Sequence, residues 1–253
     1  MTALDVIVAY LDDELDIDGF DDYGPNGLQV PGATDVARVA TGVSANLATL
    51  EAAAELRAEL VIVHHGLFWD FHRRALTPTL ARRLRLLLER EISLAGYHLP
   101  LDAHPRHGNN ALLADALGCV EVVPFGAHRG RPIGVSGRFG DDGIEATELI
   151  ARVRGATARE PLWLDYGPPR VRSIGIVSGA AASSLSEAVS TGLDAFLTGE
   201  PSEHVLGDAR EAAVHFIAAG HYATETRGVR RLGELVAARF GVEHHFIDVP
   251  NPI

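Results

Sequence analysis

The feature of this sequence that most constrains its fold is a weak internal repeat. Residues 38–66 align with residues 172–200 at a constant offset of 134, and residues 95–102 align with residues 218–225 at an offset of 123. In each copy, short apolar runs typical of buried strands alternate with helical segments rich in Ala, Leu and Glu. This alternation predicts mixed sheets flanked by helices. We therefore expect an α/β fold made of two similar units that arose by internal duplication.

The repeat also suggests how the chain divides into domains. We expect residues 1–124, together with about 220–253, to form a first α/β unit that holds most of the candidate metal ligands. We expect residues from about 125 to 219 to form the second unit, with the metal site in the cleft between the two. Residues 16–31 are rich in Gly and Pro and predict a long loop, which is either functional or simply solvated.

Composition excludes several classes of function. All 22 basic residues of the 253-residue chain are arginine, and without lysine neither Schiff-base chemistry nor a Walker-type phosphate loop is available. The net charge of −12 argues against a nucleic-acid partner, which needs a basic surface. The sequence contains no apolar run of about 18 residues, which argues against a membrane partner.

Cysteine usage and the N-terminus indicate the compartment. Cys119 is the single cysteine, so neither an internal disulfide nor a thiolate-rich metal site can form. The first residues lack the basic segment of a secretory signal. We expect a cytoplasmic protein whose chemistry depends on its 12 histidines and its carboxylates.

Histidines and carboxylates follow the ends of predicted strands, where open α/β sheets place their ligand sites. The apolar run at residues 60–63 is followed directly by His64 and His65, with Gly66 as the turn. In the repeat, His98 and Asp102 correspond to His221 and Glu225, and each pair is four residues apart, a spacing that brings side chains together on a helix. We predict one metal site from the following residues: His64, His65, Asp102, His221 and Glu225.

Imidazole and carboxylate ligands favour iron, manganese, zinc or nickel over calcium, which prefers an all-oxygen shell. Two such ions per chain are expected, although the sequence does not distinguish among the four metals. The remaining histidines are expected to be ordinary hydrogen-bonded residues of the core or surface: His72, His104, His107, His128, His204, His215, His244 and His245.

Five segments extend this pattern over nearly the whole chain: YGPNGLQV at 23–30, VIVHHGLFW at 61–69, HLPLDA at 98–103 continuing to GNN at 108–110, LTGE at 197–200, and GHYATE at 220–225. In these segments the sequence resembles the NIF-three-like dinuclear metal-centre family, whose bacterial members are labelled GTP cyclohydrolase I type 2 homologues. The length is similar to that of the short form, which lacks an inserted domain.

The resemblance implies the same five metal ligands, with Glu225 as the bridge between two ions. It also implies that His98 lies near them as an extra ligand or a proton carrier, and that the chain forms a homohexameric ring. Two positions depart from the family pattern. Gly66 replaces a proline, from which we expect a looser turn, and Leu99 replaces a threonine, which removes a hydroxyl near the site.

Two functions remain open at this point. The first is a metal-dependent hydrolase acting as a cyclohydrolase, phosphoesterase or amidohydrolase, because paired metal ions acidify water and polarise the bond under attack. The second is a non-catalytic metal-binding scaffold or regulatory interaction protein. The sequence identifies neither a purine pocket nor a triphosphate site, so the small-molecule substrate is unknown.

Overall fold

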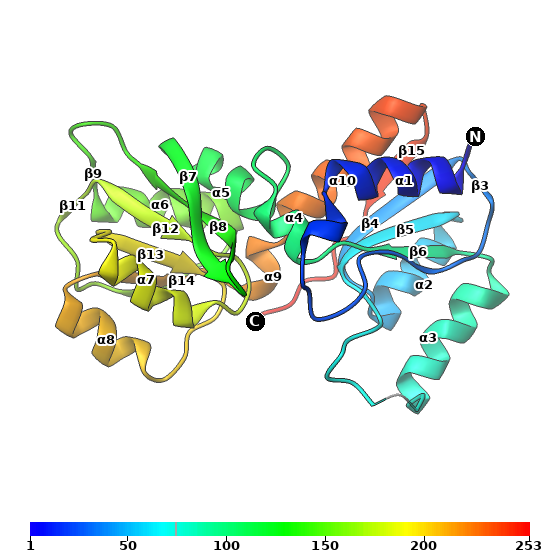
Figure 1. Cartoon of the computed structure of the whole chain (residues 1–253), viewed down its shortest axis with the longest axis horizontal. Helices are drawn as coiled ribbons and strands as arrows, with labels where there is room; N and C mark the ends of the chain where they lie inside the picture. Colours follow the sequence, from blue (N-terminus) through cyan, green and yellow to red (C-terminus); the bar gives the residue numbers. More distant parts are fainter. Residues whose placement is uncertain (74) are drawn as a thin grey trace. The chain divides into compact units, whose positions relative to one another are not determined.

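The computed structural model describes residues 1–73 and 75–253 and divides into two compact units (Figure 1). Unit 1 comprises Met1–Leu101 and Gly228–Pro250, and unit 2 comprises Asp102–Arg227 and Asn251–Ile253. Each unit contains a mixed sheet with helices packed against it. The expected α/β class is therefore confirmed. No helix in the described residues is both long and apolar enough to cross a membrane.

Unit 1 is built on a five-stranded sheet of order β15-β4-β5-β6-β2, in which only β2 runs antiparallel to its neighbour. A short β1–β3 pair lies outside this sheet. In chain order, its elements are β1 (Thr2–Ala3), α1 (Leu4–Glu14), the 3-10 helix η1 (Ile17–Gly19), β2 (Gly27–Val30), β3 (Asp35–Val36), β4 (Arg38–Ser44), α2 (Leu47–Glu55), β5 (Leu60–His65), α3 (Pro78–Glu89), β6 (Ser93–Gly96) and β15 (Glu243–Phe246).

Unit 2 is built on a six-stranded sheet of order β10-β14-β13-β12-β8-β7, whose β12, β13 and β14 are parallel. Helices α4 (Leu99–Ala103) and α10 (Thr226–Phe240) contain the junctions between the units. The remaining elements are α5 (Asn109–Leu117), β7 (Val120–His128), β8 (Arg131–Arg138), β9 (Ile144–Glu145), α6 (Ala146–Thr157), β10 (Leu162–Leu164), β11 (Arg170–Val171), β12 (Ser173–Ile176), η2 (Ala182–Ser184), α7 (Leu185–Ser190), β13 (Ala195–Thr198), α8 (Val205–Ala212), β14 (His215–Ala218) and α9 (His221–Thr224).

Local sequence signals explain where several helices begin and end. The Asn46 side chain accepts a hydrogen bond of 2.9 Å from the Thr49 amide and caps α2. Thr77 caps α3 in the same way, with Pro78 in the first turn. Gly118 ends α5 in a left-handed conformation, with φ of 78°.

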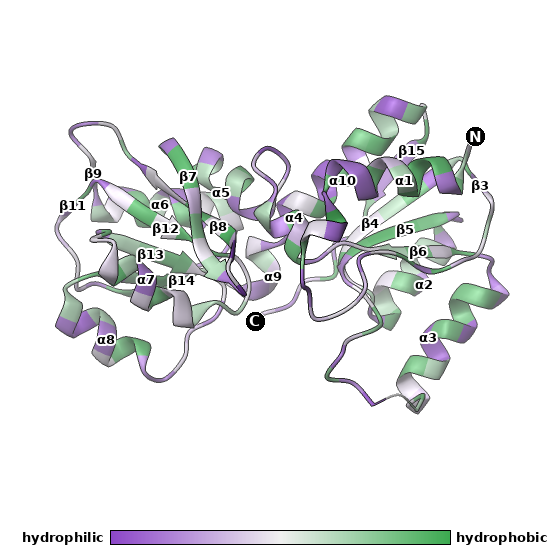
Figure 2. Ribbon diagram, in the orientation of Figure 1, coloured by the Kyte–Doolittle hydropathy of each residue, from purple (hydrophilic) through white to green (hydrophobic). Residues whose placement is uncertain are grey.

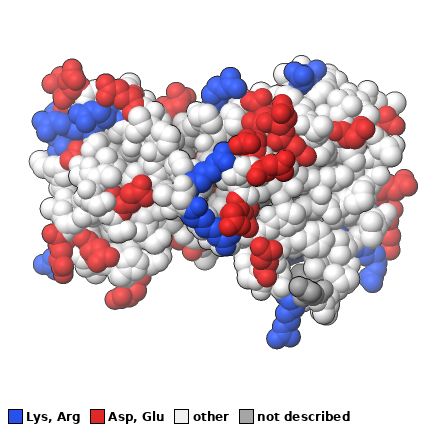
Figure 3. Space-filling view, viewed as in Figure 1, with Lys and Arg blue, Asp and Glu red and all other residues white. Residues whose placement is uncertain are grey.

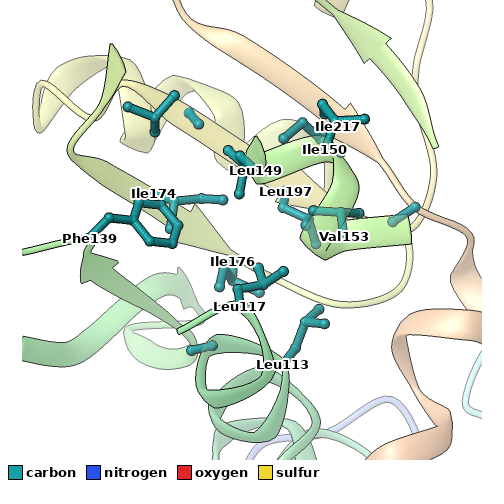
Figure 4. Packing of buried hydrophobic residues seen from close by; sticks show 14 of the residues in the cluster. Leu113, Leu117, Phe139, Leu149, Ile150, Val153, Ile174, Ile176, Leu197 and Ile217 are labelled. Carbon is teal, nitrogen blue, oxygen red and sulfur yellow. The ribbon is translucent and has the colours of Figure 1, made fainter. Parts of the chain in front are cut away.

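Hydrophobic residues concentrate along the central strands of both sheets, while α3 and α10 alternate apolar and polar faces (Figure 2). The unit 2 core packs α5 and α6 against one face of its sheet (Figure 4). Leu113 and Leu117 of α5 are fully buried in that core, among Leu149, Ile174 and Ile176. This packing explains why α5 belongs to unit 2.

The internal duplication is visible in the strand order. Strands β4, β5 and β6 of unit 1 and strands β12, β13 and β14 of unit 2 are each parallel, adjacent and joined by helical connections. The register differs by two residues: Ile62 of β5 pairs with Ala95 of β6, whereas its counterpart Phe196 of β13 pairs with Phe216, two residues before Ala218, the counterpart of Ala95. The two copies therefore share topology as well as sequence pattern.

The division of the chain differs from the expected one at both boundaries. Unit 1 ends at Leu101 rather than near residue 124, because α5 packs in the core of unit 2. The segment that carries His221 and Glu225 also belongs to unit 2. Within the expected loop 16–31, residues Gly27–Val30 form β2, which pairs with β6.

Acidic residues gather at the end of α1 and in the loop that follows it. Seven of the eleven residues at positions 12–22 are Asp or Glu. Figure 3 shows acidic side chains grouped on the visible face of unit 1. A surface of this kind creates a negative potential that attracts cations.

Candidate metal centre

Three imidazoles converge in unit 1 where two parallel strands end. His64 and His65 are the last residues of β5, and His98 follows the neighbouring strand β6. Their ring centroids are 4.7 Å apart for His64 and His65, 5.0 Å for His64 and His98, and 5.7 Å for His65 and His98. One nitrogen from each ring lies within 4.8 Å of the other two, so this group could hold a metal ion.

Hydrogen bonds set which nitrogen of each ring can act as a ligand. His64 Nδ1 donates to the Tyr97 carbonyl at 2.9 Å, and His98 Nδ1 donates to Asp22 Oδ1 at 2.7 Å. A neutral imidazole that is protonated at Nδ1 carries its lone pair on Nε2. Both rings therefore carry a proton at Nδ1, and in the neutral form each presents the lone pair of Nε2 to a metal, as is usual for metal-binding histidines.

Asp22 is the centre of a hydrogen-bond network that also holds the chain around His98. Besides His98, its carboxylate accepts bonds from the Tyr23 amide at 2.7 Å, the Leu99 amide at 2.9 Å and the Asn26 side chain at 2.9 Å. Asn26 in turn accepts the His98 amide at 2.8 Å. Burial alone would raise the pKa of Asp22, but the bond and charge of His98 and the other donors lower it to about 2.

Gln29 holds the turn that follows the histidine pair. Its Oε1 accepts the Leu67 amide at 2.8 Å, and its Nε2 donates to the Pro25 carbonyl at 2.8 Å. A Cβ atom on Gly66 would lie 2.2 Å from the Gln29 amide nitrogen, so the glycine makes room for this side chain. The turn is thus fixed by Gln29, contrary to the expectation that Gly66 would loosen it.

A small pocket lies beside the imidazoles of unit 1, with room for about one water molecule or ion. The Trp69 ring stands edge-on to His98 at a centroid distance of 5.0 Å and forms part of the wall. The pocket is lined by Gly24, Pro25, Gln29, His64, Gly66, Phe68, Trp69, Gly96 and His98.

Asp102 lies in unit 2, where neighbouring side chains fix its carboxylate. Its Oδ1 accepts bonds from Asn109 Nδ2 at 2.8 Å and from Ser178 Oγ at 2.9 Å. Asn110 donates to the Asp102 carbonyl at 3.2 Å and accepts the Ser178 amide at 2.7 Å. All four side chains are buried or partly buried, so the carboxylate has a defined orientation.

His221 lies between two carboxylates of unit 2. Its Nε2 is 3.2 Å from Glu225 Oε1, and its Nδ1 forms a short hydrogen bond with Glu200 Oε1. Burial alone would lower the pKa of His221, but the bonds and charges of Glu225 and Glu200 outweigh it and raise the pKa to about 9. The pair of carboxylates therefore favours a positive charge at this imidazole.

Two glycines leave room for His221 and Glu225 to lie close together. Gly179 has φ of +68°, and a Cβ there would lie 2.5 Å from Glu225 Oε1. Gly199 ends β13 against the backbone of His221, where a Cβ would lie 2.6 Å from the His221 Cα atom. Neither position accommodates a side chain without moving a candidate ligand.

Two of the predicted groupings are found within single units. His64, His65 and His98 meet in unit 1, and His221 meets Glu225 in unit 2, where the Asp102 carboxylate bonds Asn109 and Ser178. Glu225 lies between α9 and α10 rather than opening a helix, yet the four-residue spacing still brings it to His221.

Sequence reasoning did not assign roles to Asp22, Asn26, Gln29 or Glu200. The available signal was their position. The first three lie in the long glycine-rich loop, and Glu200 lies in the turn after β13 that corresponds to Gly66 in the repeat. Nothing in the residue types themselves distinguishes Asp22 from the acidic residues around it.

Other histidines have structural roles. His215 is 1% exposed, donates from Nε2 to the Pro168 carbonyl at 2.8 Å and accepts from Trp163 Nε1 at 3.3 Å. His244 forms a 2.9 Å hydrogen bond with Thr41 Oγ1. Both are ordinary hydrogen-bonded residues, as expected.

Comparison with known proteins identifies relatives of this chain over almost its whole length. The family model described as Duf34/NIF3 (NGG1p interacting factor 3) matches residues 2–252. The chain belongs to this family. A Pseudomonas aeruginosa member named GTP cyclohydrolase 1 type 2 homolog is 44% identical over 250 residues, covering 99% of this chain and 98% of the relative.

Solved structures give the same result for the Duf34/NIF3 fold. A structure described as protein ybgI, of unknown function, is 39% identical with a TM-score of 0.93, and the match covers 100% of both chains. Another, the protein TTHA1606 from Thermus thermophilus, is 36% identical with a TM-score of 0.91 and the same coverage. The fold of this chain is thus that of the family throughout.

Replacing Gly199 by Ala should destabilise the protein by about 2 kcal/mol, because the new methyl group must displace the His221 backbone. Chemical denaturation measures the loss. Gly207→Ala in α8 is the matched control: a Cβ there meets nothing within 4 Å, and the helix should gain up to about 1 kcal/mol. Equal stability of the Gly199→Ala variant and the wild type would contradict the close approach.

Proposed function

We propose that this protein binds two divalent transition-metal ions per chain and uses them to hydrolyse a small-molecule substrate. The residues that would hold these ions are His64, His65, Asp102, His221 and Glu225, and Glu225 would supply the bridging carboxylate. The observation that carries the proposal is the convergence of three imidazoles with their nitrogens within 4.8 Å of one another.

The donor set fits such ions. Imidazole nitrogens and carboxylate oxygens suit zinc, iron, manganese and nickel, and the candidate ligands among the described residues include no cysteine. His64 already has the Nδ1 partner and buried setting that orient a metal-binding histidine. The carboxylates on His221 raise its pKa, and they would stabilise a metal cation for the same electrostatic reason.

When bound, a pair of divalent ions supplies Lewis acidity, which acidifies water and polarises the bond under attack. The chain contributes the ligands from β5, from α4 and from the segment that follows β14. His98 lies beside the proposed ligands of unit 1 as a further ligand or proton carrier. Trp69 and Phe68 line the adjacent pocket.

The substrate is proposed only as a class. Relatives named GTP cyclohydrolase 1 type 2 homolog favour hydrolysis of a nucleotide ring, and phosphoesters and amides suit the same ligands. The alternative is a non-catalytic metal-binding scaffold or regulatory interaction protein. The family description, which refers to an interacting factor, favours that alternative.

Purified protein reconstituted with zinc, manganese or ferrous iron should hold about two ions per chain, as measured by elemental analysis after gel filtration. The double variant His64→Ala/His65→Ala should lose at least half of this metal. His72→Ala, an exposed histidine of the loop after β5, is the control and should retain all of it. Less than half of the expected metal in reconstituted wild type would refute the site.

If the protein is a hydrolase, Glu225→Gln should reduce turnover by at least about 100-fold, because it removes the bridging charge. The measurement is a screen of metal-loaded wild type against nucleotides, phosphoesters and amides, followed by assay of the variant on any substrate found. Glu203→Gln, an exposed neighbour of α8, should leave turnover unchanged. Absence of turnover across the panel with full metal loading would favour the scaffold.

We also propose that the chain assembles into a homohexamer through contacts that include β7. This strand is the edge of the unit 2 sheet, and Val120, Val122 and Val123 on it are 49%, 42% and 53% exposed. An apolar edge strand favours association with another copy of the chain. The expected number of six copies comes from the family resemblance alone.

Val123→Arg should therefore shift the mass in solution from the assembled state toward smaller species, because a buried charge opposes association. Light scattering coupled to gel filtration measures this shift. Leu206→Arg on α8, at a site that is 51% exposed, is the control and should leave the mass unchanged. A monomeric wild type would end the assembly proposal.

A further inference from the structure

Two histidines that correspond in the internal repeat are each bonded to a carboxylate from another part of the chain. His98 follows β6 and its counterpart His221 follows β14, at the offset of 123. The Nδ1 atom of His98 is 2.7 Å from Asp22 Oδ1, and the Nδ1 atom of His221 is bonded to Glu200 Oε1. The same ring atom is held in both units, although Asp22 and Glu200 do not correspond to each other in the repeat.

The Nδ1 atoms of the two β5 histidines contact neutral groups. His64 Nδ1 donates to the Tyr97 carbonyl, and His65 Nδ1 is 3.1 Å from Ser44 Oγ. A carboxylate forms a stronger hydrogen bond with an imidazole N–H than a carbonyl or hydroxyl does. It also increases the donor strength of the opposite ring nitrogen. His98 therefore differs electronically from its two neighbours in unit 1.

The chain positions the two carboxylates in different ways. The Asp22 side chain is 2% exposed and accepts two backbone amides and the Asn26 side chain in addition to His98. The Glu200 backbone amide donates to the Gly179 carbonyl at 3.0 Å, which anchors the turn that presents its side chain. The Asp22 carboxylate is thus preorganised to hold one ring in one orientation, and the anchored turn places Glu200 within reach of the His221 ring.

We propose that Asp22 and Glu200 are paired positioning residues that hold His98 and His221 with Nε2 presented for metal binding. This inference rests on the proposed metal site and adds His98 to the ligands of unit 1. It explains why a loop far from β6 in sequence closes over His98 with a buried carboxylate. It also explains why His221 contacts two carboxylates: Glu225 shares its metal, and Glu200 orients its ring.

The test measures zinc affinity by competition with a chromophoric chelator, using metal-free protein and its variants. Asp22→Asn and Glu200→Gln keep the shape of each side chain and remove its charge. Each should weaken zinc binding by about 10- to 100-fold, the usual cost of losing a partner that orients a ligand. Their controls are the exposed neighbours Asp21→Asn and Glu203→Gln, which should bind zinc as the wild type does.

Two further readouts separate positioning from a purely structural effect. The visible spectrum of the cobalt-loaded protein reports ligand geometry, and it should change in both variants and recover in part in Glu200→Asp. Metal-free Glu200→Gln should still unfold cooperatively, with a modestly lower melting temperature because the ion pair of His221 with the 34% exposed Glu200 side chain is lost. If Asp22→Asn fails to fold, the Glu200 series decides the question.

The outcomes are distinct. Wild-type zinc affinity and an unchanged cobalt spectrum in Glu200→Gln would overturn the inference while leaving the metal site intact. Failure of the wild type itself to bind zinc or cobalt would overturn the metal site, and this inference with it. Weaker binding in both variants with normal controls supports the pair as positioning residues.

Discussion

Parallel pairing of neighbouring strands is the constraint on which the candidate metal centre depends. Strands β5 and β6 run in the same direction and pair with each other. His64, His65 and His98 therefore lie together at the carboxyl ends of these strands, although His98 is more than about thirty residues from the pair in sequence. In unit 2, β13 and β14 bring Glu200 and His221 together by the same geometry. An antiparallel arrangement of either pair would place these side chains at opposite ends of the sheet.

The duplicated frame carries unequal chemistry. At the end of β5 the chain has two imidazoles, whereas the corresponding positions of unit 2 are Thr198, which bonds the backbone after β12, and Gly199, which packs against the His221 backbone. The carboxylates follow a complementary pattern, with Glu200 and Glu225 both in contact with His221 in unit 2. Duplication thus supplied two similar scaffolds, and each acquired a different part of the donor set.

Much of the fold could be predicted from the sequence because apolar periodicity and the repeat are local or nearly local signals. The strand ends, the helix caps and the spacing of His221 and Glu225 follow from such signals. The unit boundary could not be predicted, because the packing of α5 depends on contacts distant in sequence. Asp22 was also missed: its role comes from burial beside His98, which an acidic run of sequence does not reveal.

The contact between Gln29 and Gly66 has an evolutionary consequence. The Gln29 amide occupies the space that a side chain at position 66 would need, and it also binds the backbone on both sides of that space. An alanine or proline at position 66 therefore requires this amide to swing away and to give up its present bonds. Along any line of descent, the effect of a change at one of these positions depends on the residue and the side-chain orientation at the other.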